Sequence, residues 1–337
     1  MPDSNENRFL GALLGMGIGD ALGAPMRGLS RGEIASTYGV VDRYHGVAIP
    51  DAAEVNPGEF TDETEFALCI IESMTVNEGC FDPETAGVRM LHLAAGPSRN
   101  WMDDSTKAAL DRAAETLEFT VPMSDDDVAT GSVASRGVPI GLIHSMGTFD
   151  PDRLRQDVEA VVRLTHGSPA AFNAATAVAL GVRLAARGEP RETWAGETAA
   201  FLGTGDLAIR LQEIDGSIRA GCSLTEILDA SGTGSEAIQV VPAAFAAAML
   251  EPEFARAVAA ALAAGGATDT IGALTGALAG AANGASGIPQ RLIDGLEGRI
   301  YLSLAGPWFF KAARKRAGQV IDLRPVHGPR PELPPRY

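Results

Sequence analysis

Two short segments carry the residue types that hold hard metal ions. Thr61-Asp62-Glu63-Thr64 and Thr268-Asp269-Thr270 each place hydroxyls and carboxylates at the start of an apolar stretch with helical periodicity. The simplest interpretation is structural, because threonine caps helices well and acidic side chains in a first turn complement the helix dipole. If the segments meet in space, their clustered oxygens match the ligands that Mg²⁺ or Mn²⁺ prefer. Spacing alone leaves both interpretations open.

Two glycine-striped stretches would position these segments. One stripe has glycines at positions 11, 15, 19 and 23, with Asp20 beside it, and the other has glycines at 272, 276, 280 and 284. Residues four apart lie on one face of a helix, and each mid-helix glycine costs about 0.5–1 kcal/mol relative to alanine. We therefore expect two helices that pack with their backbones in close approach, against each other or a common neighbour. Ordinary core helices without a site between them are the alternative.

The composition limits the class of protein. The 337 residues carry a net charge of −16, which argues against a general nucleic-acid binder or a protein of anionic membranes. One small phosphate-bearing ligand stays compatible with that charge, because it needs only a few local donors. The three cysteines, Cys69, Cys80 and Cys222, are widely spaced without a CxxC pair, so they favour thiols in a reducing cytoplasm.

The polar N-terminus does not look like a signal peptide, and Asp269 with its glycines interrupts the most membrane-like stretch, 256–282. Abundant alanine and few aromatic residues favour helices over sheet. We predict one all-α domain over residues 1–322, a loop over 40–59 and a Pro-rich tail over 323–337. Periodicity and capping residues predict helices at 9–24, 30–38, over FALCIIESM after residues 60–65, at 83–95, 104–118, within 130–146, two within 151–188, and at 191–202, 206–219, 223–230, 235–249, 252–264, from Thr268-Asp269-Thr270 through the glycines up to 284, and at 290–304.

Five motifs occur in the order found in one known family. They are GALLGMGIGDALGAPM, PGEFTDETEFAL, TGSVASRGVPIGL, LTHGSPAAFNAATAVAL and GGATDTIGALTGALAGAANGASGIP. The second is similar to P-G-x-[YF]-T-D-D-T, the third to G-N-G-A-A-M-R-x-A-P-x-G, and the last to G-G-D-T-D-T followed by a glycine-striped helix. Over roughly residues 8–300 the chain therefore resembles the ADP-ribosylglycohydrolase superfamily, which includes the hydrolase of ADP-ribosylated dinitrogenase reductase.

The resemblance implies a compact all-α fold with a central binuclear Mg²⁺ site. The family cleaves the N- or O-glycosidic bond at C1″ of an ADP-ribosyl group, with metal ions orienting the ribose hydroxyls and a carboxylate activating water. Carried over position by position, the implied metal ligands are Thr61, Asp62, Glu63, Asp269 and Thr270. Asp62, Glu63 and Asp269 are also the implied catalytic residues.

The resemblance also implies a set of substrate-binding positions. These are Gly131, Ser132 and Val133 in the loop that receives the diphosphate and ribose, His166 at the T-H position, and Gly265 and Gly266. To these we add Arg27, which departs from the family pattern and would read an anionic group of the substrate. A histidine like His166 is also often a core residue with all its hydrogen bonds satisfied.

Several positions depart from the family pattern. Ala267 stands where the family has the first Asp of G-G-D-T-D-T, and Glu63 replaces the second Asp of T-D-D-T. Arg27 stands where many members carry a glutamate, and serines at 132 and 135 replace a Gly and a Met of the loop. Losing a carboxylate and gaining a cation lowers the affinity for a dication, so we expect one of the two metal ions to be weak or absent. Arg27 would pair with Glu63 or Asp269, or hold an anionic group of the ligand; a surface arginine is the alternative.

Three functions are compatible with these residues. The first is hydrolysis of an N-ribosyl bond, with a small ribosylated metabolite rather than a modified protein as substrate. The second is an inactive binder of ADP-ribose or a related nucleotide, and the third a purely structural role, since lens-crystallin relatives exist in the superfamily. We expect a cytoplasmic protein with no nucleic-acid or membrane partner.

Overall fold

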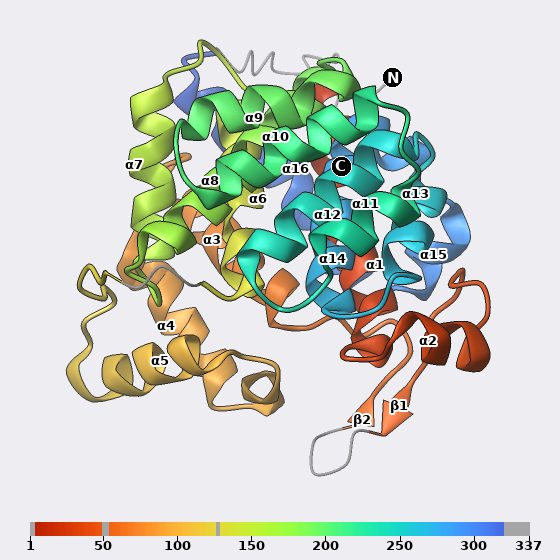
Figure 1. Cartoon of the computed structure of the whole chain (residues 1–337). Coiled ribbons are helices and arrows are strands. Elements are labelled where there is room, and N and C mark those ends of the chain that lie inside the picture. The colour runs from red at the N-terminus through yellow and green to blue at the C-terminus, as the bar shows by residue number, and fades with distance from the viewer. Residues whose placement is uncertain (1–3, 49–53, 126–128, 320–337) are drawn as a thin grey trace, which may run out of the picture.

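Two glycine-striped helices cross the centre of the molecule side by side. The computed structural model describes residues 4–48, 54–125 and 129–319, and in it α1 (Ser4–Gly23) packs along α14 (Thr268–Asn283) (Figure 1). A Cβ placed on Gly19 would lie 1.9 Å from the carbonyl oxygen of Gly272, and one on Gly276 would lie 1.9 Å from that of Gly15. Only glycine permits such contact, so the predicted close approach of the two helices is confirmed.

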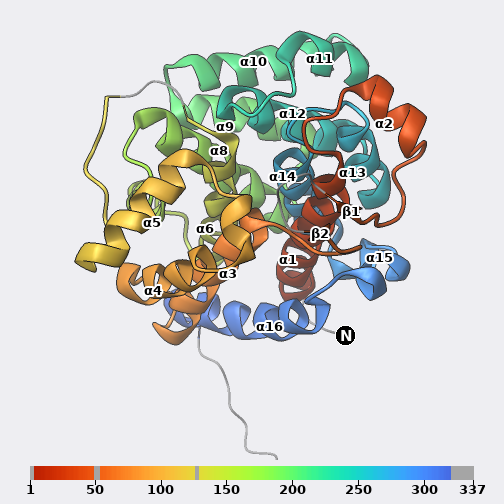
Figure 2. The ribbon, with the colours of Figure 1, turned by 90° about the horizontal axis from the view of Figure 1, so that it is seen from below.

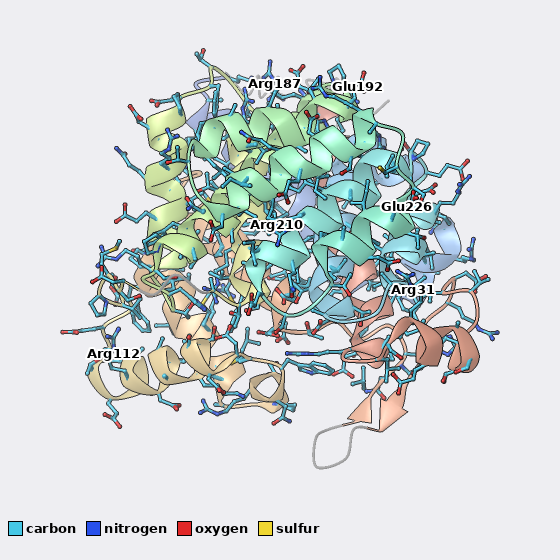
Figure 3. The ribbon with its side chains drawn as sticks, in the orientation of Figure 1. Arg31, Arg112, Arg187, Glu192, Arg210 and Glu226 are labelled. Atoms are coloured by element: carbon cyan, nitrogen blue, oxygen red, sulfur yellow. The ribbon has the colours of Figure 1, made fainter. Side chains whose placement is uncertain are left out.

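The central pair is surrounded by other helices on most sides (Figures 1 and 2). α14 packs against α12 (Ala237–Leu250), α13 (Phe254–Leu262) and α8 (Pro169–Arg187), whereas α1 also packs against α16 (Arg299–Arg316). α1 and α8 are long and apolar enough to span a membrane, but both are mostly buried inside the fold. Charged side chains are carried by the surrounding elements, as Figure 3 shows for Arg31, Arg112, Arg187, Glu192, Arg210 and Glu226.

The remaining helices follow the predicted order. They are α2 (Arg31–Thr37), α3 (Asp62–Val76), α4 (Pro83–Ala94), α5 (Asp104–Thr116), α6 (Gly137–His144), α7 (Pro151–Val162), α9 (Trp194–Leu202), α10 (Asp206–Arg219), α11 (Leu224–Ser231) and α15 (Gln290–Gly295). Short 3₁₀ turns lie at η1 (Ala24–Met26), η2 (Pro97–Asn100), η3 (Gly131–Arg136), η4 (Arg191–Thr193) and η5 (Ala285–Gly287). The all-α prediction is confirmed, and so is the capping box of α2, in which Ser30 and Glu33 exchange hydrogen bonds.

Three local predictions need correction. The 40–59 segment contains an antiparallel pair of two-residue strands, β1 (Val47–Ala48) and β2 (Glu54–Val55), too short for alternation to reveal. The predicted 290–304 helix is two helices, because Gly298 adopts a φ of 71° between them. α16 then continues through Pro307, beyond the end that the sequence predicts.

One further detail differs from the sequence prediction, and two predictions fall wholly or partly outside the described residues. Gly284 is not a helical position, since it ends α14 with a φ of 71°. Ser124-Asp125-Asp126-Asp127, whose pattern is that of a helix cap, lies partly outside the described residues, and the tail at 323–337 lies outside them entirely. The domain boundary at 322 stays a prediction.

Candidate active site

A cleft opens where α1 ends and where α3 and α14 begin. Its volume is about 620 Å³, and its lining includes Arg27, Glu63, Trp101, Asp103, Ser132 and Asp269. The first turns of α3 and α14 border this region through Glu63, Asp269 and Thr270, and the positive ends of the two helix dipoles favour negative charge there.

Asp20 ties the end of α1 to the start of α3. Its carboxylate accepts hydrogen bonds from the backbone N–H and hydroxyl of Thr61, at 3.1 and 2.9 Å, and from those of Thr64, at 3.2 and 2.6 Å. Thr61 is the N-cap of α3 and accepts from the N–H of Glu63, so the capping interpretation of this segment is confirmed. Complete burial raises the pKa of Asp20 to about 7, although these hydrogen bonds oppose the rise.

The two hydroxyl–carboxylate segments meet in space, which spacing alone left open. Thr270 Oγ1 donates to Glu63 Oε1 over 2.6 Å and thereby joins the first turns of α14 and α3. The other oxygen of Glu63, Oε2, is buried without a hydrogen-bond partner among the described residues. Thr268 instead donates to the carbonyl of Gly23 and fixes the helix pair.

Arg27 brings a positive charge into this carboxylate cluster. Its Nη1 lies 3.0 Å from Asp269 Oδ2, while the side chain of Asp269 is only 3% exposed. The same Nη1 donates to the carbonyl of Trp101 at 3.2 Å, and the guanidinium carbon lies 5.7 Å from the centroid of the Trp101 ring. Asp269 is the main reason why the pKa of Arg27 is raised. Of the alternatives for Arg27, the structure shows the pair with Asp269.

Carboxyl groups nevertheless outnumber the guanidinium in this cluster, since Asp62, Glu63 and Asp269 accompany Arg27. Burial, followed by repulsion from neighbouring carboxylates, raises the pKa values of Asp62 and Glu63 well above their usual range. Asp269 repels both of them, and Arg27 lowers the pKa of Asp62 only in part. The cluster would therefore gain free energy from a further cation.

The residues offer hard oxygen ligands for one dication and fewer for a second. Asp62 and Glu63, with hydroxyl oxygens of Thr61 and Thr270, are hard ligands, and Thr270 Oγ1 already lies 2.6 Å from Glu63 Oε1. Mg²⁺ is often held by one or two carboxylates and several waters. A second ion would have to share Asp269 with Arg27, and Ala267 offers it no carboxylate. Within residues 4–48, 54–125 and 129–319, no group of three or more His, Cys, Asp or Glu side chains gathers as a metal-binding cluster.

The opposite wall of the cleft is built on Asp103. Its Oδ2 accepts from the hydroxyls of Ser132, at 2.6 Å, and Thr130, at 3.1 Å, while His166 Nε2 lies 3.6 Å from Oδ1. Burial alone would raise the pKa of Asp103, but His166 and the hydrogen bonds outweigh it and lower the pKa to about 2. This carboxylate therefore stays ionised at neutral pH.

His166 is held from behind by Arg136, which is completely buried. Arg136 can only donate, and its Nη1 lies 3.1 Å from His166 Nδ1, so the ring proton is assigned to Nε2 on the side of Asp103. Burial and the adjacent Arg136 lower the pKa of His166 to about 4, despite Asp103. Both predicted interpretations of His166, a core histidine and a site residue, therefore apply in part. The ring is nearly buried, and its Nε2 lies beside Asp103 in the wall of the cleft.

The predicted site residues fall into two groups. Those that line the cleft are Arg27, Glu63, Ser132, Gly266, Asp269 and Thr270. Those that do not line it are Thr61, Asp62, Gly131, Val133, His166 and Gly265. The glycines are explained by packing: a Cβ on Gly266 would lie 1.8 Å from the carbonyl oxygen of Thr233, and one on Gly131 would lie 2.3 Å from Val240.

Sequence reasoning missed Trp101, Asp103 and Thr130. Asp103 carries a recognisable signal, because it precedes a helix and its Oδ1 accepts from Thr106 N as an ordinary N-cap. Because the capping role is enough to explain an aspartate here, the sequence gives no sign that the second oxygen, Oδ2, accepts from Ser132 and Thr130 at the cleft.

Comparison with known proteins agrees with the fold and the cleft. A solved structure described as an ADP-ribosylglycohydrolase-related protein complex superposes with a TM-score of 0.68 at 27% identity, covering 92% of this chain and 99% of its own. This all-α fold, with acidic helix starts facing a cleft, is thus that of ADP-ribosylglycohydrolases. The chain belongs to the ADP-ribosylglycohydrolase family, whose model matches residues 1–322.

Relatives of the chain include proteins of archaea and bacteria. An uncharacterized protein of Archaeoglobus fulgidus is 28% identical over 88% of this chain and 94% of its own length. The uncharacterized protein YegU of Escherichia coli is 29% identical over 79% of this chain and 85% of its length. The ADP-ribosyl-[dinitrogen reductase] glycohydrolase of Rhodospirillum rubrum is 30% identical over 49% of this chain and 53% of its own. Membership supports hydrolysis of ADP-ribosyl-type glycosidic bonds as the general activity.

Proposed function

We propose that the protein hydrolyses the N-glycosidic bond of a small ribosylated or ADP-ribosylated metabolite. The observation that carries the proposal is the contact between Glu63 and Thr270, which unites the acidic starts of α3 and α14 beside a cleft. A cleft of about 620 Å³ is within the usual range for small-molecule sites. Lys107 and Arg27 line it and supply cations for an anionic group of the substrate.

The reaction replaces the C1″–N bond of the ribose by a C1″–O bond to water. Glu63 accepts the proton of the attacking water through Oε2, which has no hydrogen-bond partner among the described residues. Asp62, the preceding residue, adds negative charge beside it. The departing nitrogen takes up a proton from bulk water, and Glu63 returns its own proton to the solvent after the reaction. The positive charge that develops on the ribose is stabilised by the surrounding carboxylates. Asp269 accepts hydrogen bonds from ribose hydroxyls, and Ser132 with the adjacent loop backbone positions the remainder of the substrate.

Asp62, Glu63, Thr61 and Thr270 would hold one Mg²⁺ or Mn²⁺. When bound, such an ion would orient the ribose hydroxyls and polarise water. Arg27 serves as a resident cation beside Asp269 in the place of a second ion. The ion pair at 3.0 Å and the alanine at 267 support this division of roles.

The test is a hydrolysis assay on a panel of N-ribosyl and N-ADP-ribosyl compounds. Free ribose or ADP-ribose is measured by chromatography with Mg²⁺, with Mn²⁺ and with a chelator. Glu63→Gln should lower turnover by a factor of about 10² or more, in line with loss of a general base. Glu65→Gln is the matched control, since Glu65 lies on the same helix, is partly buried and bonds Ser98 outside the cleft. Absence of released product under every condition would defeat the proposal.

Binding of ADP-ribose without turnover is the second candidate. It is favoured by Ala267 and by the neutralisation of Asp269 by Arg27, both of which weaken metal binding. Titration calorimetry that detects ADP-ribose binding, combined with a silent hydrolysis panel, would select this candidate over the first.

A further inference from the structure

The outer face of α16 is apolar, although no element of the described chain covers it. Ile300, Tyr301, Leu304 and Trp308 are 69%, 45%, 61% and 60% exposed. Their spacing places them on one face of the helix, and we name these four side chains the α16 stripe. The other large hydrophobic residues with high exposure in the described chain are scattered singly, at Val40, Val76, Val88, Leu117, Met123 and Ile209.

The stripe is presented by a firmly anchored helix. On the opposite face of α16, the rings of Phe309 and Phe310 lie 5.9 and 5.1 Å from the ring of Phe9. α16 also packs on α3 and runs along the outer edge of the molecule (Figure 2). Since the inner face already fills the core, the outer stripe has no folding role that would explain four large apolar side chains.

The stripe lies away from the candidate active site. α16 contacts the N-terminal part of α1 through Phe9, whereas the cleft lies beyond the other end of α1, at Arg27. A partner on the stripe would therefore leave the cleft open to substrate.

The charges at the two ends of the stripe are opposite. Exposed Glu297 lies two residues before the start of α16, separated from it by Gly298, and exposed Lys311 follows the stripe, with its Nζ 4.4 Å from the centroid of the Trp308 ring. Both charges are seven positions from Leu304, and Ile300 and Trp308 are both four positions from it. An antiparallel copy of the same helix would thus place Ile300 against Trp308. It would also bring the end of α16 preceded by Glu297 to the partner's end that carries Lys311, and the twofold axis repeats both contacts. Antiparallel helices also oppose their dipoles.

We propose that the α16 stripe is a self-association surface, at which two copies of the chain pair antiparallel about a twofold axis at Leu304. A twofold axis requires a self-complementary patch, and the stripe with its charged ends meets that requirement. Its apolar area is on the order of 400 Å² per copy, about half of a standard interface. The dimer is therefore weak, with a dissociation constant in the micromolar range or above.

Sedimentation velocity of the full chain over a wide concentration range tests the proposal. The 35.0 kDa monomer should shift toward twice that mass as concentration rises. Leu304→Glu puts two like charges on the axis and should abolish the shift. Ile209→Glu, at an isolated site that is 51% exposed on α10, should leave it unchanged. Unaltered thermal unfolding midpoints in both variants confirm that the fold is retained.

Charge exchange separates self-association from other occupants. Glu297→Lys and Lys311→Glu should each weaken the dimer at least several-fold, and the double variant should restore it. Leu304→Cys in a Cys80→Ser background should form an intermolecular disulfide when an added oxidant accepts the two electrons, whereas Ile209→Cys should not. Cys80 is removed because it is itself exposed.

Three results would overturn the proposal. One is a monomer at every concentration with no cross-link through Leu304→Cys. Another is a monomer that binds anionic lipid vesicles through the stripe. The last is a chain that dimerises only after residues 320–337 are deleted, since the stripe would then be covered by that segment.

Discussion

Arg27 Nη1 and Asp269 Oδ2 lie 3.0 Å apart although the two residues come from opposite ends of the chain. The guanidinium is held by Asp269, by the carbonyl of Trp101 and by the Trp101 ring, so its position is fixed before any ligand binds. A preorganised cation of this kind can hold an anionic site together without a metal ion. Because arginine keeps its charge at every accessible pH, it is also a cation that a chelator cannot remove.

Removal of Arg27 should make the site less stable and more responsive to metal ions. Arg27→Ala leaves the buried Asp269 unpaired, which we expect to cost about 1–2 kcal/mol, less than a fully buried pair because Arg27 is 44% exposed. Excess Mg²⁺ should then raise the unfolding midpoint more than in the unaltered protein, since it replaces the missing charge. Arg31→Ala is the control, because its ion pair with Asp229 is exposed on both sides. Equal midpoint shifts with Mg²⁺ in all three proteins would contradict the role of Arg27.

A double substitution should create the second metal position. Ala267→Asp supplies a carboxylate next to Asp269, and Arg27→Glu removes the competing cation from Asp269 Oδ2. Titration calorimetry with Mn²⁺ should show a stoichiometry one ion higher in the double variant than in the unaltered chain. Ala267→Asp alone should bind the extra ion more weakly, because Arg27 remains. No increase in stoichiometry would mean that the arginine does not stand in for an ion.

The fold could be predicted where the sequence constrains it strongly. Glycines four apart on two stretches predicted a backbone contact, and Gly19 against Gly272 shows it. The predicted bounds 290–304 were wrong at both Gly298 and Pro307. Both residue types often end helices, but here Gly298 separates two helices whereas α16 continues through Pro307, and the sequence alone does not distinguish the two outcomes. Only packing of the following residues on α1 decides between a helix end and a helix that continues through proline.

The candidate site was only partly predictable. Glu63 and Asp269 stood in motifs, but no local pattern links the cleft wall at Trp101 and Asp103 to them. These two residues reach the cleft because η2 and the start of α5 lie opposite α14, a tertiary relationship without a sequence period. Asp103 also has an ordinary capping role, which is sufficient to explain an aspartate at that position.

The central glycines should tolerate no side chain. Gly19→Ala would bring Cβ within 1.9 Å of the carbonyl oxygen of Gly272, and neither backbone can move without separating α1 from α14. We expect destabilisation by about 3 kcal/mol, measured by denaturant unfolding. Gly216→Ala in α10 is the matched control, since nothing lies within 4 Å of the position that its new methyl group would take, and it should be neutral or stabilising by up to about 1 kcal/mol. Similar stabilities of the two variants would show that the contact between α1 and α14 does not set the cost.

His166 should make the protein sensitive to mild acid. Its pKa is about 4 in the folded chain, because of burial and of Arg136, compared with an ordinary value of 6.5. Below pH 6.5 the unfolded chain takes up a proton that the folded chain does not, so stability falls between about pH 6.5 and pH 4. The loss from this residue reaches about 3 kcal/mol. Asp103 adds to the loss only at lower pH, because its pKa of about 2 lies below its usual value and its contribution disappears as pH falls toward 2.

His166→Gln isolates this effect, since glutamine keeps a donor and an acceptor but does not titrate in this range. The free energy of unfolding should be measured by urea denaturation at several pH values for both proteins. We expect the unaltered chain to lose stability more steeply than the variant between pH 6.5 and pH 4, and the two curves to run parallel above pH 7. His92→Gln, on the outer helix α4, provides the comparison for removal of a histidine elsewhere. Parallel curves for His166→Gln and the unaltered chain throughout would mean that His166 is protonated in the folded protein, and the hydrogen bond from Arg136 to its Nδ1 would then be wrong.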